Sequence, residues 1–257
     1  MPPFEPARLV SRPVFILAPI RSGSTLLRCL LNSHPAVLAP HELHLRYLDV
    51  DIGSEYTDLA MGTLGWSRAE LRHMLWDRIL HRQLQASGRA VVVDKSPSNT
   101  FIVDELRACW PEARFIRLRR HPAAIAASIV AADDGRDLAA AVEHVLRVAA
   151  LIDERTDLDG AAVVRYEDLT ADPAKVCAEL CEFLGIPADP RMVDYGRHDH
   201  GPFVYGIGDW SERIRSGRVQ PPARVPHPCP AALHELCERW GYPVAAEPVE
   251  SPMRTVG

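Results

Sequence analysis

The sequence predicts an α/β fold in which helices flank a parallel β-sheet. Short β-type runs alternate with helical stretches long enough to cross over a sheet, and this alternation favours parallel strands. The chain has 257 residues, of which 47% are hydrophobic and 25% are charged, as in globular proteins of enzyme size. We expect a single domain over residues 1–257 that opens with a Pro-rich lead-in at 1–12.

Four runs have the length and the β-branched content of strands, and helical stretches separate them. They span residues 14–18, 90–94, 114–118 and 161–165. Two regular apolar stripes mark helix faces that cover the sheet. The first stripe holds Leu138, Val142, Val145, Ala149 and Ile152, and the second, in a helix opened by Pro173, holds Val176, Leu180 and Phe183.

Residues 189–230 are rich in Gly, Pro, His and Arg and have no clear periodicity. They predict a long irregular C-terminal segment before a final helix near residues 232–240. Because long loops often cover a substrate, we expect this segment to close over a bound cofactor or substrate.

The composition excludes several classes of protein. The 29 Lys and Arg against 34 Asp and Glu give a net charge of −5, which argues against a general nucleic-acid binder. No apolar run approaches the roughly 18 residues that span a bilayer, and the N-terminus lacks the pattern of a secretory signal. We therefore expect a cytoplasmic protein without a membrane span. The six Cys are scattered without metal-ligand spacing, so we expect reduced thiols and no metal.

The first candidate site lies between the first predicted strand and a helix over residues 26–31. Where a strand, a tight loop and a helix follow one another, backbone N–H groups point at an anion. Ser24 and Thr25 add hydroxyl donors and Arg21 adds a cation. The loop lacks the spacing and the lysine of a Walker A motif, which disfavours an ATP-using kinase. A tight turn with a Ser/Thr cap is the structural alternative.

The segment PIRSGSTLL resembles the 5′-phosphosulfate loop of sulfotransferases that use 3′-phosphoadenosine 5′-phosphosulfate (PAPS). This resemblance implies a P-loop-like fold and PAPS as the cofactor. The residues that it implies for binding the 5′ end are Arg21, Ser22, Gly23, Ser24 and Thr25.

The second candidate site follows the predicted strand at 114–118. Arg120 lies at the strand end and Ser128 lies on the next helix, a pairing of cation and hydroxyl that suits one phosphate. Sulfotransferases have a similar Arg eight residues before a Ser, and both hold the 3′-phosphate of PAPS. An Arg paired with a neighbouring carboxylate is the structural alternative.

Two later segments also resemble the family. Tyr166, in VRYEDL, is similar to a tyrosine that lies near the adenine. Residues 206–218 resemble the C-terminal loop that folds over the cofactor, and there we expect Ser211 and Arg213 to bind it. Which basic residue of this loop reaches the 3′-phosphate stays open.

Sulfuryl transfer to a hydroxyl needs a base for the acceptor proton and positive charge where the leaving phosphate gains charge. Arg21 supplies charge at the leaving end. Lys95, one of two lysines, follows the predicted strand at 90–94, at the edge where ligands of open sheets gather. A similar lysine contacts the leaving group in tyrosyl-protein and polyketide-associated sulfotransferases, and the resemblance implies this role for Lys95.

The segment APHELHL supplies the candidate base. Glu42 resembles the glutamate that takes the acceptor proton in the polyketide-associated and tyrosyl-protein enzymes. His41 stands where the polyketide-associated pattern more often has Pro. Cytosolic small-molecule sulfotransferases use a His, which keeps His41, His44, His198 and His200 as alternatives.

The sequence thus predicts a PAPS-dependent O-sulfotransferase whose acceptor is a small-molecule or carrier-tethered hydroxyl. A metabolite kinase that uses Mg-ATP and a non-catalytic nucleotide-binding module are the alternatives; the module would lack a base and a leaving-group cation. We expect the acceptor pocket around residues 49–66 and 189–206. Aromatic residues suited to a ring-bearing acceptor lie in or beside them: Tyr47, Tyr56, Trp66, Tyr195, Phe203 and Tyr205.

Overall fold

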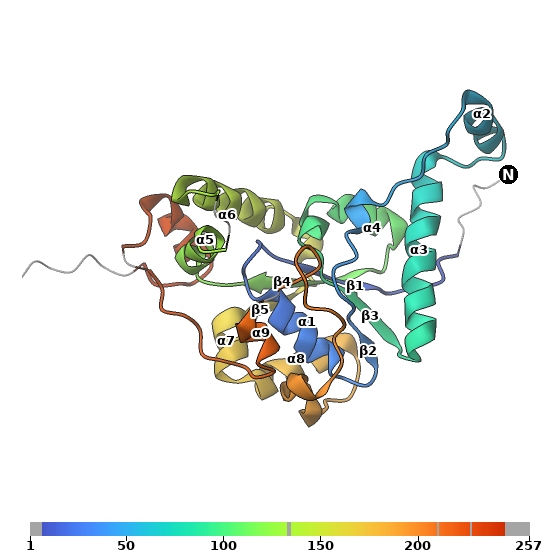
Figure 1. Cartoon of the computed structure of the whole chain (residues 1–257). Helices are drawn as coiled ribbons and strands as arrows, with labels where there is room; N and C mark the ends of the chain where they lie inside the picture. The colour runs from blue at the N-terminus through green and yellow to red at the C-terminus, as the bar shows by residue number, and fades with distance from the viewer. Residues whose placement is uncertain (1–6, 133–134, 210, 227, 245–257) are drawn as a thin grey trace, which may run out of the picture.

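Five parallel strands form the centre of the molecule in the order β2-β3-β1-β4-β5, with helices on both sides of the sheet (Figure 1). A computed structural model describes residues 7–132, 135–209, 211–226 and 228–244. The predicted α/β fold is confirmed, and the first six residues of the lead-in lie outside the described residues. The strands are β1 (Val14–Leu17), β2 (Val37–Leu38), β3 (Val91–Asp94), β4 (Arg114–Arg119) and β5 (Ala162–Arg165).

The central strand β1 is buried on both faces. Its side chains alternate, so Val14 and Ile16 pack in one core while Phe15 and Leu17 pack in the other. The first core includes α1 and α8, and the second includes α3, α4 and α6; α5 and α10 pack with α6 in a third cluster. These helices are α1 (Ser24–Asn32), α3 (Arg68–Ser87), α4 (Val103–Cys109), α5 (Pro122–Val130), α6 (Leu138–Asp153), α8 (Pro173–Leu184) and α10 (His234–Arg239).

All four predicted strands are present, and each end agrees within one residue. Strand β2 was not predicted, because two residues are too short to form a periodic pattern. The short helix α7 (Tyr166–Ala171) follows β5 directly, so Tyr166, its first residue, lies at the carboxyl edge of the sheet. Within the described ranges, no helix combines the length and the apolar character needed to cross a membrane.

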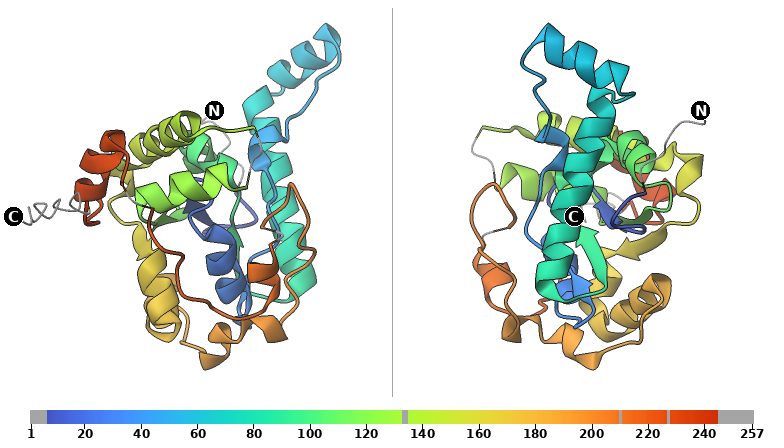
Figure 2. Two further views of the ribbon diagram at one scale, coloured as in Figure 1. Left: turned by 60° about the vertical axis from the view of Figure 1, so that its left-hand side comes forward. Right: turned by 90° about the vertical axis from the view of Figure 1, so that its right-hand side faces the viewer.

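Helix α2 (Glu55–Thr63) and its flanking loops form an arm that stands away from the sheet (Figure 2). None of the residues of α2 is buried, and Tyr56 and Leu59 are among the most exposed large side chains. Local capping supports the arm, since the Ser54 and Ser67 hydroxyls accept hydrogen bonds from the first turns of α2 and α3. The expectation that residues 49–66 build the acceptor pocket conflicts with this placement.

The segment 189–230 is irregular, as predicted, with only short helical pieces such as α9 (Glu212–Arg215). Tyr195 anchors it from inside, because its buried hydroxyl donates to the carbonyls of Ile214 and Arg218. Gly196 and Gly217 touch backbone to backbone, and a Cβ added at Gly217 would lie 2.6 Å from the Gly196 Cα. These contacts hold the early part of the segment against its later part.

Candidate active site

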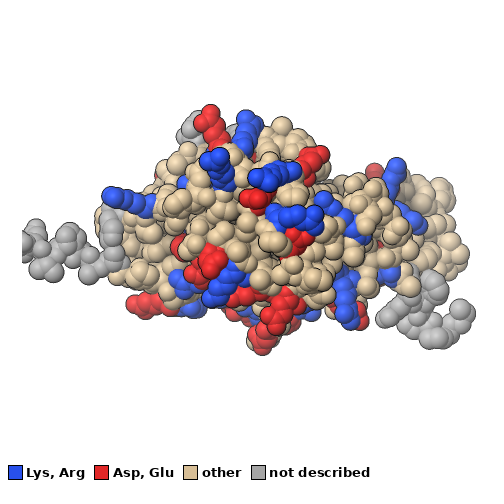
Figure 3. Space-filling model, turned by 90° about the horizontal axis from the view of Figure 1, so that it is seen from below, with Lys and Arg blue, Asp and Glu red and all other residues tan. Residues whose placement is uncertain are grey.

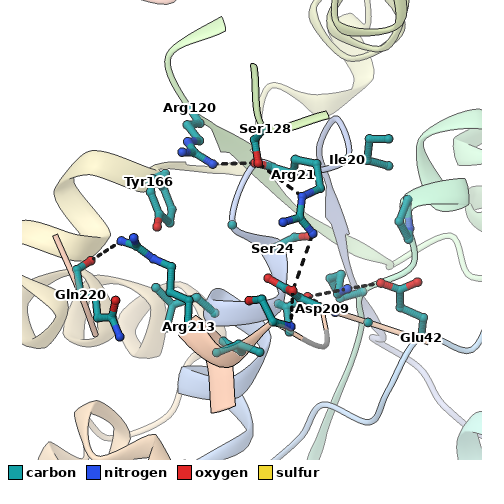
Figure 4. A pocket seen from close by; sticks show the side chains of 18 of the residues that line it. Ile20, Arg21, Ser24, Glu42, Arg120, Ser128, Tyr166, Asp209, Arg213 and Gln220 are labelled. Carbon is teal, nitrogen blue, oxygen red and sulfur yellow. Dashed lines mark hydrogen bonds and ion pairs between the residues drawn. The ribbon is translucent and has the colours of Figure 1, made fainter. Parts of the chain in front are cut away.

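A cavity of about 430 Å³ lies where the loops after β1, β2, β3 and β4 meet the C-terminal segment (Figure 4). Five cationic side chains and two carboxylates line it, although the whole chain has a net charge of −5. On the outer face seen in Figure 3, by contrast, basic and acidic side chains are interspersed. The cavity therefore suits an anionic ligand. The charged lining residues are Arg21, Glu42, Lys95, Arg120, Asp209, Arg213 and Arg218.

The loop after β1 turns through two left-handed residues, Arg21 (φ 64°) and Gly23 (φ 90°). A Cβ at Gly23 would lie 2.2 Å from Tyr166 Cδ2, so only glycine lets the tyrosine ring pack on this loop. Helix α1 begins at the next residue, and Ser24 and Thr25 line the cavity. The Ser22 side chain differs from the expectation, because it is fully buried and is absent from the cavity lining.

The two predicted phosphate sites meet in this cavity. Arg120 Nη1 donates a hydrogen bond of 2.8 Å to the Arg21 carbonyl, and Arg21 Nε lies 3.4 Å from Ser128 Oγ. The Arg120 guanidinium also stacks over Tyr166, 4.7 Å from the ring centre. Burial lowers the pKa of Arg120, but a guanidinium remains charged in proteins. Arg120 Nε is buried and has no hydrogen-bond partner among the described residues, so this cation retains capacity to bind a ligand.

The C-terminal segment adds Ser211, Arg213 and Arg218 to the lining. Arg215 turns away, since its Nη2 donates to the Phe203 carbonyl at 2.9 Å. Arg213 and Arg218 are therefore the arginines of the 206–218 loop that line the cavity. Trp210, in the middle of this motif, lies outside the described residues.

Asp209 is a site residue that the sequence reasoning missed. Its carboxylate lies 3.6 Å from Arg21 Nη1, and its backbone N–H donates to Thr25 Oγ1 at 3.2 Å. The signal that could have found it is an aspartate between two glycines and a run of arginines, in the loop that resembles the family's C-terminal loop. Asp209 thus joins the C-terminal segment to the loop after β1 and the start of α1.

Lys95 and Glu42 form a buried ion pair at the side of the cavity, and their side chains are 3% and 9% exposed. Lys95 Nζ also donates to Thr25 Oγ1 at 3.1 Å. Burial lowers the pKa of Lys95, and the charge of Glu42 acts in the opposite direction. Because Thr25 Oγ1 accepts from Lys95 and from the backbone, its own O–H is left to donate.

Asp94 fixes the loop that carries Glu42. Its buried carboxylate accepts hydrogen bonds from Asn99 Nδ2 (2.8 Å), Ser96 Oγ (3.1 Å) and the Leu43 N–H (3.4 Å). Burial raises the pKa of Asp94, and these three donors oppose that effect. The residues after β2 and after β3 are therefore held together at one edge of the sheet.

Of the four histidine alternatives, His44 is the one whose ring contacts the carboxylate of Glu42. Its Nε2 lies 3.3 Å from Glu42 Oε2 and 2.7 Å from the Gly206 carbonyl. The His41 ring instead faces the Glu42 carbonyl, and His41 is absent from the cavity lining. His200 is buried between Asn32 and the Tyr195 carbonyl, with the His198 ring beside it. His200 therefore anchors the C-terminal segment.

Comparison with known proteins agrees with this arrangement. The model of a family described as the sulfotransferase family matches residues 13–190. Nodulation protein NoeE of Sinorhizobium fredii (strain NBRC 101917 / NGR234) is 34% identical over 128 residues, which are 45% of this chain and 30% of NoeE. An uncharacterized protein of Aquifex aeolicus (strain VF5) is 27% identical over 214 residues, 72% of this chain and 27% of that protein. The chain spans less than a third of the length of these curated relatives.

Solved structures give the same fold. The sulfotransferase domain of the Synechococcus PCC 7002 olefin synthase has a TM-score of 0.63 at 24% identity, covering 94% of this chain and 98% of that domain. The sulfotransferase domain from the curacin biosynthetic pathway has a TM-score of 0.63 at 20% identity, covering 93% and 100%. The family match includes the loops after β1, β2, β3 and β4 that build the cavity. On this evidence the chain belongs to the sulfotransferase family.

Proposed function

We propose that the chain transfers the sulfuryl group of PAPS to a hydroxyl of a small-molecule or carrier-tethered acceptor. One observation carries the proposal, namely the buried contact of Lys95 with both Glu42 and the phosphate-loop residue Thr25. It brings a cation and a carboxylate together beside an anion cavity. A nucleotide-binding module without catalysis has no need of that pair.

The donor set of the cavity fits a nucleotide with phosphates at both ends of its ribose. The phosphate loop offers Arg21, Ser24, Thr25 and the first N–H groups of α1 for the 5′ end. Arg120, with its unpartnered Nε, and Ser128 lie beside the loop, where they suit the 3′-phosphate. Tyr166 offers a ring face for the base, and Ser211, Arg213 and Arg218 close the cavity from the C-terminal segment.

Glu42 accepts the proton of the acceptor hydroxyl as the hydroxyl oxygen forms its bond to sulfur. Lys95 and Arg21 donate toward the bridging oxygen, which leaves with the 5′-phosphate when the old sulfur–oxygen bond breaks. His44, which is held by the Gly206 carbonyl, packs 3.3 Å from the second carboxylate oxygen of Glu42 and limits its movement. The products are a sulfate ester and 3′-phosphoadenosine 5′-phosphate.

Calorimetry tests the nucleotide site directly. The protein without magnesium is titrated with 3′-phosphoadenosine 5′-phosphate and with 5′-AMP, beside the variants Arg120→Ala and Arg12→Ala. We expect the bisphosphate to bind at least about tenfold more tightly than AMP, because the 3′-phosphate forms charge-assisted hydrogen bonds. Arg120→Ala loses this preference, whereas Arg12→Ala, which removes an exposed arginine paired with Glu112, keeps it.

The proposal fails if the wild-type protein binds both nucleotides equally well. In that case ATP with magnesium is the next ligand to titrate. If the protein does prefer the 3′-phosphate, sulfuryl transfer is measured next with labelled PAPS and a panel of hydroxyl compounds.

A further inference from the structure

A second, smaller cavity of about 170 Å³ adjoins the anion cavity. Ile20 and Pro97 line both cavities, so the two spaces meet at these side chains. His44 lines the small cavity, and its ring contacts Glu42, which lines the large one. The small cavity therefore adjoins both the proposed base, through His44, and the start of the loop after β1, through Ile20.

The walls of the small cavity are mainly apolar. Tyr47, Phe101 and Val148 contribute a phenol ring, a phenyl ring and an aliphatic side chain, and Ala18 adds a methyl group. An apolar cavity of about 150 Å³ holds one benzene molecule. The volume here matches a single six-membered ring.

Two residues that line this cavity each carry a buried polar atom without a partner. Ser98 Oγ and His144 Nε2 are buried, and within the described residues neither forms a hydrogen bond. The Ser98 residue as a whole is only 7% exposed. Unpartnered buried polar atoms cost free energy, which a ligand with a matching polar group recovers.

His144 is a neutral hydrogen-bonding group at neutral pH. Burial, followed by the charges of Arg136 and Arg147, lowers the pKa of His144 to about 4. A neutral imidazole nitrogen either donates or accepts, depending on the tautomer, and a serine hydroxyl does both. Together the two residues suit an uncharged polar substituent such as a hydroxyl or an amide.

We propose that the small cavity binds the acceptor, and that Ser98 and His144 select acceptors of one ring that carry a second polar substituent besides the reacting hydroxyl. The inference rests on the proposed sulfuryl transfer and names the substrate class for it. The reacting hydroxyl lies toward His44 and Glu42, the ring lies between Tyr47, Phe101 and Val148, and the second substituent reaches Ser98 and His144.

Two isosteric acceptors test the selection. Hydroquinone and 4-methylphenol share one ring and one reacting hydroxyl, and they differ in a hydroxyl or a methyl group at the opposite position. We expect kcat/KM with PAPS to be at least about tenfold higher for hydroquinone, since the methyl group leaves two buried polar atoms unpaired. Calorimetry on protein saturated with 3′-phosphoadenosine 5′-phosphate is expected to show the same preference in binding.

Four variants separate the specific role from a structural one. In Ser98→Ala and His144→Leu we expect the ratio of kcat/KM for hydroquinone to kcat/KM for 4-methylphenol to fall to about two, the statistical factor for two equivalent hydroxyls. His144→Gln is expected to retain part of the wild-type preference for hydroquinone. Tyr56→Ala, on the exposed arm, keeps the full ratio. Thermal unfolding confirms that each variant is folded.

The inference is overturned if wild-type protein treats the two phenols alike, if hexan-1-ol is as good an acceptor, or if neither phenol binds. The titration with 3′-phosphoadenosine 5′-phosphate and AMP tests the proposed function independently of the acceptor. A retained preference for the 3′-phosphate keeps the proposed function even when the acceptor assignment fails, and its loss overturns both.

Discussion

Lys95 and Glu42 lie 53 positions apart in the chain, and their side chains meet because β2 and β3 are parallel neighbours. Glu42 comes four residues after β2, and Lys95 comes directly after β3. Residues that follow adjacent parallel strands emerge at the same edge of the sheet. A two-residue strand therefore determines which carboxylate faces the lysine.

Removing either partner of this pair is expected to reduce sulfuryl transfer. Glu42→Gln loses the base and lowers kcat about 10²- to 10⁴-fold, and Lys95→Met removes a donor at the leaving oxygen and lowers kcat about 10²- to 10³-fold. Lys175→Met, which removes the exposed lysine of α8, leaves kcat unchanged. Single-turnover kinetics with saturating PAPS measures the chemical step. A kcat of Lys95→Met within twofold of wild type would contradict the role of Lys95.

Glu42 and Lys95 are expected to be strongly coupled in their effects on the unfolding free energy. Each single variant leaves one buried charge without its partner, which costs about 3–5 kcal/mol of unfolding free energy. The double variant Glu42→Gln/Lys95→Met regains much of this loss and remains inactive. Urea unfolding of the four proteins gives the coupling energy. Additive losses would mean that the two side chains do not depend on each other for stability.

Gly23→Ala is expected to lower the unfolding free energy by about 2–4 kcal/mol and to weaken binding of 3′-phosphoadenosine 5′-phosphate. The substitution places a Cβ at φ 90° and against the Tyr166 ring. Gly53→Ala is the matched control, because Gly53 also has positive φ but has open space around its Cβ position. Thermal unfolding and calorimetry measure the two effects. Equal losses in both variants would exclude the packing of Tyr166 as a cause.

His200 is expected to make the protein sensitive to mild acid. Its Nε2 contacts the Tyr195 carbonyl and its Nδ1 faces the Asn32 amide nitrogen, an arrangement that fits only the neutral ring. Burial lowers the pKa of His200 to about 4, against about 6.5 in the unfolded chain. Between these values the unfolded state binds a proton that the folded state does not, so stability falls as pH drops from about 6.5 to 4.

His200 is expected to contribute about 3 kcal/mol to the loss of unfolding free energy between pH 6.5 and pH 4. Urea unfolding at pH 7.5 and pH 4.5 measures it in wild type, in His200→Gln and in the control His81→Gln. His200→Gln is expected to be less stable than wild type at pH 7.5 but to lose less unfolding free energy between pH 7.5 and pH 4.5. The same pH dependence in all three proteins would assign the acid sensitivity to other groups.

Substitutions on the arm are expected to leave the fold intact. Tyr56→Ser and Leu59→Ser change exposed side chains of a helix that buries none of its residues, so the unfolding free energy shifts by no more than about 0.5 kcal/mol. Leu80→Ser, in the buried part of α3, is the contrasting control and costs several times more. Thermal unfolding compares them. A large loss in Tyr56→Ser would mean that the arm packs against another surface in solution.

The sequence predicted the parts of the fold that have a regular pattern. The runs at 14–18 and 114–118 are hydrophobic enough to identify as buried strands, and the stripe from Leu138 to Ile152 identifies a helix. Strand β2 is visible only through its pairing with β3, and the position of the arm depends on tertiary packing. Neither has a local signal in the chain.

The residues of the candidate site also fall into two groups: those that a local pattern predicts and those that only the folded loops bring into place. Arg21 and Arg120 could be predicted because each follows a strong strand, and Arg120 does line the cavity with Arg21. The inward turn of the Ser22 side chain and the contact of Asp209 with Arg21 depend on loop conformation. The small cavity at His144 arises where α6 approaches residues 97–101, positions that are far apart in the sequence.

In the part of the chain that the structure describes, Ile20 and Pro97 are the only residues that line both cavities. With the acceptor in the small cavity, mutations at Tyr47, Phe101 or His144 alter which molecules are sulfated and leave the nucleotide contacts intact. Directed evolution toward a new acceptor then needs a library at only a handful of codons.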